Sequence, residues 1–140
     1  MMTHQRGFQR GPESARRLAS AGGQLLAGAD DTHGRYTLIR ATSPPGDSTP
    51  LHRHTAMDES FYVLAGSYTV TCGDDQFEVS AGEFVHLPAG LPHKVEAGRT
   101  GGEKLILGHP AGLERFFAEW DAGADDVHEL GRRHGIEFLE

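Results

Sequence analysis

From residue 24 to residue 109 the chain consists of short runs rich in apolar and β-branched residues, and turn-forming stretches separate these runs. Runs of this length favour strands, whereas the Gly, Pro and Asp residues between them favour turns. Such spacing is typical of an antiparallel sandwich or barrel. Strands are predicted over residues 24–28, 35–42, 51–54, 59–66, 67–72, 76–80, 83–88, 93–97 and 103–109.

The pattern changes after Pro110, where apolar residues recur at the spacing of one helix face. A helix is therefore predicted up to Gly123, and a second short helix between Asp125 and Gly135. The apolar face of the first helix should pack onto the sheet, although a role in ligand binding stays open. This face consists of Leu113, Phe116, Phe117 and Trp120.

The length of 140 residues suits a single domain with one core. The 19 Gly and 7 Pro residues are too many for a helical bundle and fit strands joined by turns. Residues 1–20 are polar and rich in Arg, so a flexible N-terminal arm is predicted there, with one short helical turn near its end. Residues 21–110 should form a β-barrel, and residues 111–140 a helical extension packed on the barrel.

Composition and charge argue against several classes of partner. The formal net charge is −7 and no basic stripe is present, so neither nucleic acid nor an anionic membrane is an expected partner. No apolar run has the length of a signal-peptide core or of a membrane-spanning helix. Cys72 is the only cysteine, so no disulfide can form within the chain, and a cytoplasmic location is expected.

The candidate chemistry begins with two histidines one residue apart, His52 and His54. Alternate residues of a strand point to the same face, so both imidazoles should point to one side of the sheet. A tight connection would place Glu59, early in the next predicted strand, beside them. Phe61 and Val63 would share the face of Glu59 and wall this site with apolar surface.

His93 begins a later predicted strand, and it could add a third imidazole to this group. Three imidazoles and one carboxylate suit one divalent transition metal ion, for which Fe, Mn, Ni, Cu and Zn are all candidates. Such a ligand set can leave a position open for substrate or dioxygen. The alternative is that the histidine pair arises by chance in a chain with nine histidines, and that these are hydrogen-bonded core residues.

Two motifs in this region resemble those of the cupins. The first is matched by Gly46, His52, His54, Glu59 and Gly66, and the second by Gly82, Pro88, Gly90 and His93. The resemblance is to small single-domain members related to quercetin dioxygenase-like and polyketide cyclase-like proteins. It implies a cupin double-stranded β-helix, which is a jelly-roll-like barrel, with short C-terminal helices. It also implies a homodimer, and a metal ion bound by the three histidines and the glutamate of the motifs. Ala97 stands where the second motif commonly ends with Asn, but that Asn is not a usual metal ligand, so the implied ligand set is unchanged.

A metal ion held by neutral imidazoles and one carboxylate keeps positive charge, so the expected substrate is a small oxygen-rich molecule such as an enol or phenol. An apolar wall formed by Phe61, Val63 and Phe84 suits an aromatic or polyketide-like body, while His86 either lines this pocket or is structural. The resemblance implies that Glu59 can leave the metal and accept the substrate proton. A dioxygenase is the first hypothesis. The alternatives are a redox-neutral cyclase or isomerase and a non-catalytic protein that binds a metal or a small molecule.

Overall fold

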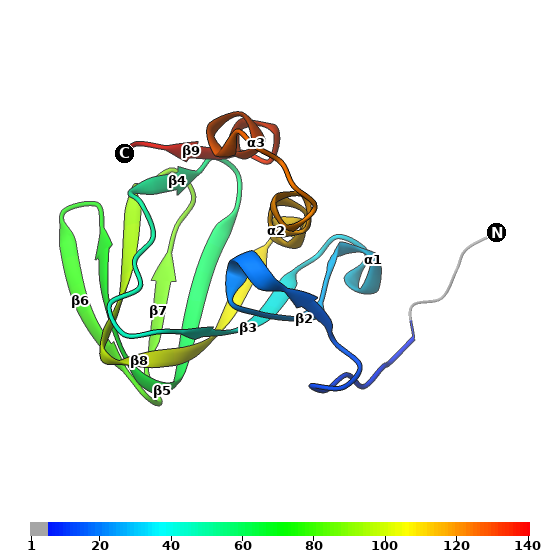
Figure 1. The fold of residues 1–140 in the computed structure, drawn as a ribbon, viewed down its shortest axis with the longest axis horizontal. Coiled ribbons are helices and arrows are strands. Elements are labelled where there is room, and N and C mark those ends of the chain that lie inside the picture. Colours follow the sequence, from blue (N-terminus) through cyan, green and yellow to red (C-terminus); the bar gives the residue numbers. More distant parts are fainter. Residues whose placement is uncertain (1–5) are drawn as a thin grey trace.

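Antiparallel strands form the frame of the molecule in the computed structural model, which describes residues 6–140 (Figure 1). The predicted all-β fold with short C-terminal helices is confirmed. The strands are β1 (Arg16–Leu18), β2 (Gly23–Ala27), β3 (Thr37–Ser43), β4 (His52–His54), β5 (Asp58–Cys72), β6 (Asp75–Ser80), β7 (Phe84–Leu87), β8 (His93–His109) and β9 (Ile136–Phe138). The helical elements are the 3₁₀-helix η1 (Ala19–Ala21) and the α-helices α1 (Ala29–Thr32), α2 (Leu113–Asp121) and α3 (Val127–Arg133).

Two long strands, β5 and β8, organise the sheet by pairing with each other along most of their length. The register of this pairing shifts near Gly66, as in a β-bulge. Gly66 has a φ of 68°, and a Cβ at this position would lie 2.1 Å from the backbone oxygen of Gly101, so the close approach requires glycine. The sequence predicted two separate strands in each of these segments, but the irregularity bends β5 and β8 without ending them.

The bend in β5 and β8 distributes the other strands between two parts of a barrel (Figure 1). The first half of β5 pairs with β7 and with the second half of β8, which also pairs with β3. The second half of β5 pairs with β6 and with the first half of β8, which also pairs with β4. Alternate side chains point into the barrel and form its core, which includes Phe61, Val63, Val70, Leu87 and Val95.

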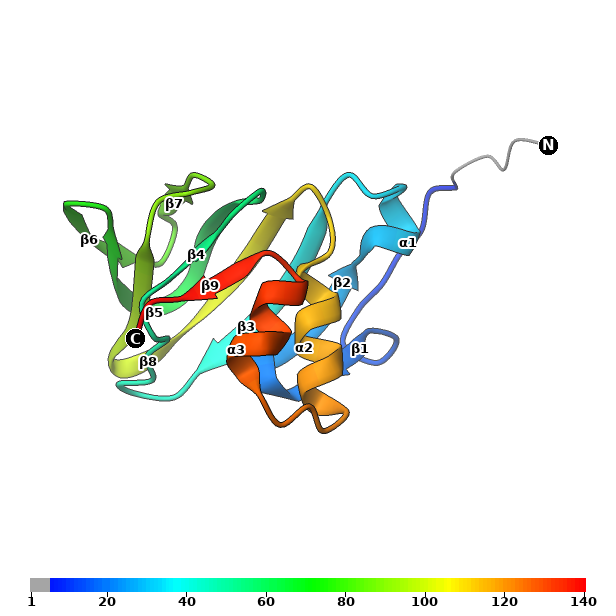
Figure 2. The ribbon, with the colours of Figure 1, turned by 90° about the horizontal axis from the view of Figure 1, so that it is seen from above.

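The C-terminal extension contains a strand as well as the two predicted helices. Figure 2 shows α2 and α3 side by side next to the β1–β3 part of the sheet, with β9 returning along β4. Leu113 and Phe116 of α2 and Leu130 of α3 are buried in the core, which anchors the extension to the barrel. No helix in the described part of the chain has the length and apolar character needed to cross a membrane.

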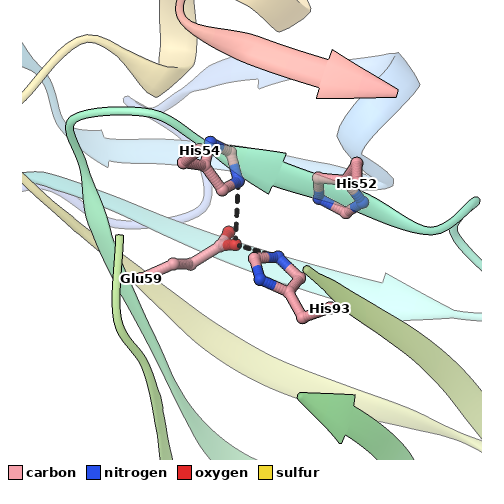
Figure 3. A group of neighbouring side chains, drawn as sticks. All are labelled: His52, His54, Glu59 and His93. Carbon is pink, nitrogen blue, oxygen red and sulfur yellow. Dashed lines mark ion pairs between the residues drawn. The ribbon is translucent and has the colours of Figure 1, made fainter. Parts of the chain in front are cut away.

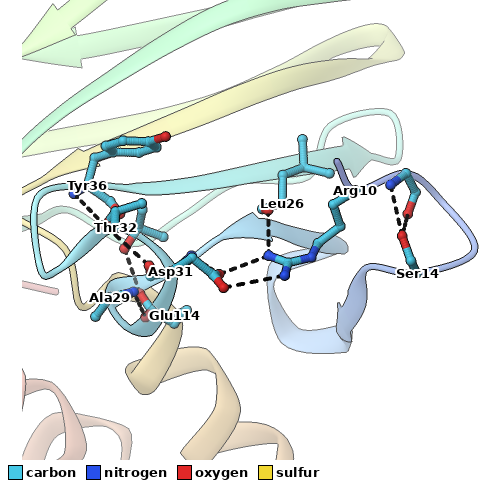
Figure 4. Close-up of polar contacts among 11 residues, drawn as sticks. Arg10, Ser14, Leu26, Ala29, Asp31, Thr32, Tyr36 and Glu114 are labelled. Carbon is cyan, nitrogen blue, oxygen red and sulfur yellow. Dashed lines mark hydrogen bonds and ion pairs between the residues drawn. The ribbon is translucent and has the colours of Figure 1, made fainter. Parts of the chain in front are cut away.

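Within the flexible arm predicted over residues 1–20, Arg10 and residues 16–18 are held against the rest of the protein. The Arg10 guanidinium donates hydrogen bonds to the Leu26 carbonyl oxygen at 2.9 Å and to the Asp31 carboxylate at 2.9 and 3.3 Å (Figure 4). Residues 16–18 pair with β2, and the Leu18 side chain is fully buried. A strand and a 3₁₀-helix therefore replace the predicted helical turn, while residues 1–5 lie outside the described part of the chain.

Candidate metal centre

The strand β4 presents His52 and His54 to the barrel interior, as the alternation of strand side chains predicts. Its pairing explains how so short a strand is held in place. His52 pairs with His93 of β8 on one side and with Phe138 of β9 on the other, and His54 pairs with Ile136. The C-terminal strand, which the sequence did not predict, therefore fixes one edge of the strand that carries two candidate ligands.

Glu59 lies early in β5 and points toward the histidines across the barrel (Figure 3). One oxygen of its carboxylate, Oε1, lies 3.2 Å from Nε2 of His54 and 3.2 Å from Nε2 of His93. The ring of His52 lies 4.4 Å from that of His93, measured between centroids. One donor atom from each of the four residues lies within 4.8 Å of the other three, so the structure brings together all the ligands predicted from the sequence.

The donor atoms fit a transition metal ion. Nε2 of His54 and both ring nitrogens of His93 are buried and have no hydrogen-bond partner within residues 6–140, although Oε1 of Glu59 lies 3.2 Å from Nε2 of each histidine. A buried nitrogen without a partner is costly, and coordination of a cation would satisfy it. Two ligands on opposite sides of one ion lie roughly 4.2 Å apart, so the spread of 4.8 Å requires only a small contraction.

The protonation states also suit cation binding. The His52 pKa falls to about 4, because burial and the neighbouring His93 disfavour its charged form. Nδ1 of His52 lies 2.7 Å from the Pro50 carbonyl oxygen, which can only accept, so Nδ1 carries the proton and Nε2 keeps its lone pair. Burial alone would raise the pKa of the Glu59 carboxyl, but contact with His54 and His93 outweighs burial and lowers this pKa below its usual value. Neutral imidazole and ionised carboxylate are the forms that coordinate metals.

The predicted pocket residues divide into two groups. Phe61 and Val63 follow Glu59 on the inner face of β5, as predicted, but they are buried within the core. Phe84 and His86 point outward from β7, and the Phe84 side chain is 63% exposed. The prediction that these two line the site is therefore wrong, because Val85 and Leu87 are the residues of β7 that occupy the inner face. His86 instead lies with Nδ1 2.9 Å from the Ser60 hydroxyl on the outside of the barrel.

A cavity of about 330 Å³ lies between the C-terminal extension and β4, and the sequence did not predict it. His52 and His54 form part of its wall, so it reaches the histidine cluster directly. Its apolar lining includes Phe116, Phe117, Trp120, Val127, Ile136 and Phe138. The apolar face of α2 was the available signal. It packs on the sheet as predicted and also lines this cavity, while a role in ligand binding stays a prediction.

Comparison with known proteins is consistent with the motifs and the fold. The cupin domain family matches residues 39–107. An uncharacterized protein of Methanocaldococcus jannaschii is 36% identical over 62 residues, which is 44% of this chain and 50% of that protein. Quercetin 2,3-dioxygenase of Bacillus subtilis is 29% identical over 70 residues, which is 50% of this chain and 21% of that enzyme. The chain therefore spans half or less of the length of these two relatives.

The solved structure of an RmlC-like cupin from Shewanella frigidimarina superposes with a TM-score of 0.66 over 81% of this chain and 99% of that chain. The sequence identity of 18% makes this a likeness of fold. A barrel of this architecture, both motifs in order, and the family match over the strands that carry all four cluster residues lead to one conclusion. The chain is a small member of the cupin family.

Proposed function

We propose that this cupin is a metal-dependent dioxygenase that acts on a small oxygen-rich molecule with an aromatic or polyketide-like body. The observation that carries this proposal is the aromatic-lined cavity with His52 and His54 in its wall. Its volume of about 330 Å³ lies at the lower end of the range typical of small-molecule sites. The partial similarity to a quercetin 2,3-dioxygenase adds support for this substrate class.

In this proposal His52, His54, His93 and Glu59 hold one divalent transition metal ion, of Fe, Mn, Ni, Cu or Zn. The bound ion would supply a Lewis acid for an oxygen atom of the substrate and, if it is redox-active, a means of using dioxygen. The protein contributes a fixed arrangement of donors, since β8 and β9 hold both edges of β4. It also contributes an apolar cavity wall that orients the substrate and restricts water.

Glu59 is the proposed catalytic residue. Its carboxylate is ionised and buried, and it faces two of the three imidazoles. An enol or phenol that enters from the cavity side, where His54 forms the wall, would bring its hydroxyl toward this carboxylate. Glu59 would accept the hydroxyl proton and leave an electron-rich oxygen on the substrate.

The test begins with elemental analysis of protein purified without chelators, followed by oxygen uptake on addition of quercetin as a flavonol probe. A redox-active metal near one ion per chain, with oxygen uptake that requires His54 and Glu59, supports the proposal. Zinc without oxygen uptake contradicts the dioxygenase and leaves the redox-neutral alternative. His86→Ala is the matched control, because this histidine lies on the outer face and should affect neither metal content nor oxygen uptake.

We also propose that the chain forms a homodimer through the outer face of the sheet, and that it functions in the cytoplasm. The outer face formed by β5, β7 and β8 exposes Tyr62, Leu64, Phe84 and Leu107. Tyr62 pairs directly with Phe84, so these two exposed aromatic side chains are neighbours on this face. A surface of this kind favours association with a second copy.

The acidic composition of the chain and its single cysteine are compatible with the proposed location in the cytoplasm.

A further inference from the structure

A second cavity, of about 270 Å³, borders His54 and is distinct from the aromatic-lined cavity. The two cavities share three wall residues, which are His54, Leu113 and Ile136, and these side chains lie between the two spaces. The other walls of the second cavity come from the connection between β4 and β5, from the segment before α2, and from the end of α3. A ligand bound there would therefore lie beside the candidate metal centre without occupying the aromatic-lined cavity.

Every ionisable side chain in the wall of this second cavity is basic. The wall contains Arg115 of α2, and Arg133 and His134 at the end of α3, in addition to His54. No Asp or Glu among residues 6–140 lines it. The whole chain has 20 acidic residues against 13 Lys and Arg, so this lining is opposite in charge to the protein as a whole. We call this space the basic cavity, and its lining favours a negatively charged ligand.

The two guanidinium groups are accessible and only loosely paired. The Arg115 side chain is 59% exposed, and its Nη2 lies 3.8 Å from the Asp30 carboxylate. The Arg133 side chain is 56% exposed, and its Nη1 lies 3.4 Å from Oε2 of Glu119, an oxygen that also faces His134. Within residues 6–140 neither guanidinium donates a hydrogen bond, and exposed ion pairs of this length contribute little. Both groups therefore keep donors for an acceptor that enters the basic cavity.

We propose that the basic cavity binds a small carboxylic acid, as a molecule separate from the substrate of the aromatic-lined cavity. A guanidinium presents its donors in a planar fork that matches a carboxylate. The apolar wall formed by Met57, Pro110 and Ala111 suits a short aliphatic body, and the volume of about 270 Å³ limits the ligand to a small one. The wall between the two cavities favours a second molecule over an extension of the first. The inference goes beyond the proposed function, because it requires neither a metal ion nor oxygen chemistry.

Succinate and its neutral analogue succinamide provide the probe pair, and isothermal titration calorimetry provides the readout. The wild-type protein should bind succinate at least about tenfold more tightly than succinamide, as one charge-assisted hydrogen bond implies. The double variant Arg115→Gln/Arg133→Gln should lose at least about tenfold in succinate affinity, and both positions are exposed enough for the fold to tolerate the change.

Arg132→Gln is the matched control, because Arg132 precedes Arg133 on α3 and is exposed but does not line the basic cavity. This variant should bind succinate within about twofold of the wild type. Equal affinity of the wild type for the two probes, or an unchanged succinate affinity in the double variant, would overturn the proposal. A loss in Arg132→Gln as large as that in the double variant would also overturn it, since the effect would then be one of general charge.

Two side chains of the wild type report which cavity succinate occupies. Met57 lines only the basic cavity, and Trp120, the single tryptophan of the chain, lines only the aromatic-lined cavity. In protein labelled with ¹³C at the methionine methyl groups and ¹⁵N at the indole, succinate should move the Met57 signal and leave the Trp120 signal in place. Met57→Leu assigns the methyl signal among the three methionines. A Met57 signal that stays in place at saturating succinate, or a Trp120 signal that moves, contradicts the proposal.

The metal content of each protein is measured separately, and the titrations are repeated on metal-free protein. Succinate affinity that depends on Arg115 and Arg133 should persist there, because neither arginine belongs to the histidine cluster. If the wild type binds no metal, the proposed function fails, while this arginine-dependent binding still supports the present inference. Succinate binding that disappears with the metal contradicts the inference and leaves the proposed function standing.

Discussion

Replacement of Lys104 by Met should stabilise the protein, because the variant removes a buried charge and keeps a flexible apolar side chain of similar length. Burial lowers the pKa of this group from 10.5 to about 8, against the opposing charges of Glu59 and Asp47. At about 1.4 kcal/mol per pKa unit, the charged form costs the native state about 3 kcal/mol at neutral pH. Lys104→Met should recover much of this free energy of unfolding.

The sign of the pH dependence follows from the lowered pKa. Between pH 8 and pH 10.5 the unfolded chain keeps the lysine proton and the native protein loses it, so native stability rises with pH across this window. The stability gained when Lys104 loses its proton is fully present above pH 10.5. It decreases as the pH falls from 10.5 to 8 and is lost below pH 8. Between pH 7.5 and pH 9.5 the wild-type free energy of unfolding should rise by about 2 kcal/mol relative to Lys104→Met.

Urea denaturation of metal-free protein at 25 °C, at half-unit steps across this range, provides the measurement. Other titrating groups contribute equally to both proteins, so the difference between the two curves isolates Lys104. Lys94→Met serves as the control and should follow the wild-type curve, because Lys94 is on the surface. Parallel curves for wild type and Lys104→Met, or a variant less stable than wild type by more than about 1 kcal/mol at pH 7.5, would refute the reasoning.

Three further predictions concern the centre, the cavity and the outer face. His54→Ala should lower the metal content per chain at least about tenfold by elemental analysis, since a donor of the cluster is lost, and His86→Ala should leave it unchanged. Phe138→Ala should lower the free energy of unfolding by about 2 kcal/mol in urea denaturation and weaken metal binding, because this ring packs near His52; unchanged metal affinity would contradict the role given to β9. Phe84→Ser should convert a dimer to a monomer in sedimentation, whereas a wild type that sediments as a monomer contradicts the proposed interface.

The sequence predicted the position of the candidate ligands well, because strand alternation is local. A spacing of two places His52 and His54 on one face whatever the rest of the fold does. The same alternation could not decide which face of β7 points inward, because Phe84 and Val85 are both apolar. The exposed aromatic ring was therefore assigned to the pocket, and the buried valine was not.

The other differences between the sequence predictions and the structure come from contacts between distant parts of the chain. The N-terminal segment looks like a flexible arm in composition, yet Arg10 pairs with Asp31 and Leu18 enters the core. The strand β9 has only three residues and directly follows a helix, so its alternation of apolar and polar residues is too short to predict a strand. The apolar face of α2 was recognised, but a pattern within one helix cannot show that a cavity beside it reaches His52.

The pairing of β9 with β4 couples the shape of the cavity to the position of two candidate metal ligands. Ile136 and Phe138 belong to the cavity wall, and their backbones hold the strand that carries His52 and His54. A change that widens or reshapes the cavity through β9 will therefore also displace two donors relative to His93 and Glu59. We expect that substitutions of Ile136 or Phe138 that change substrate preference will also change metal affinity. Substitutions in α2, which lines the cavity but is not paired with β4, should change substrate preference with a smaller effect on metal affinity.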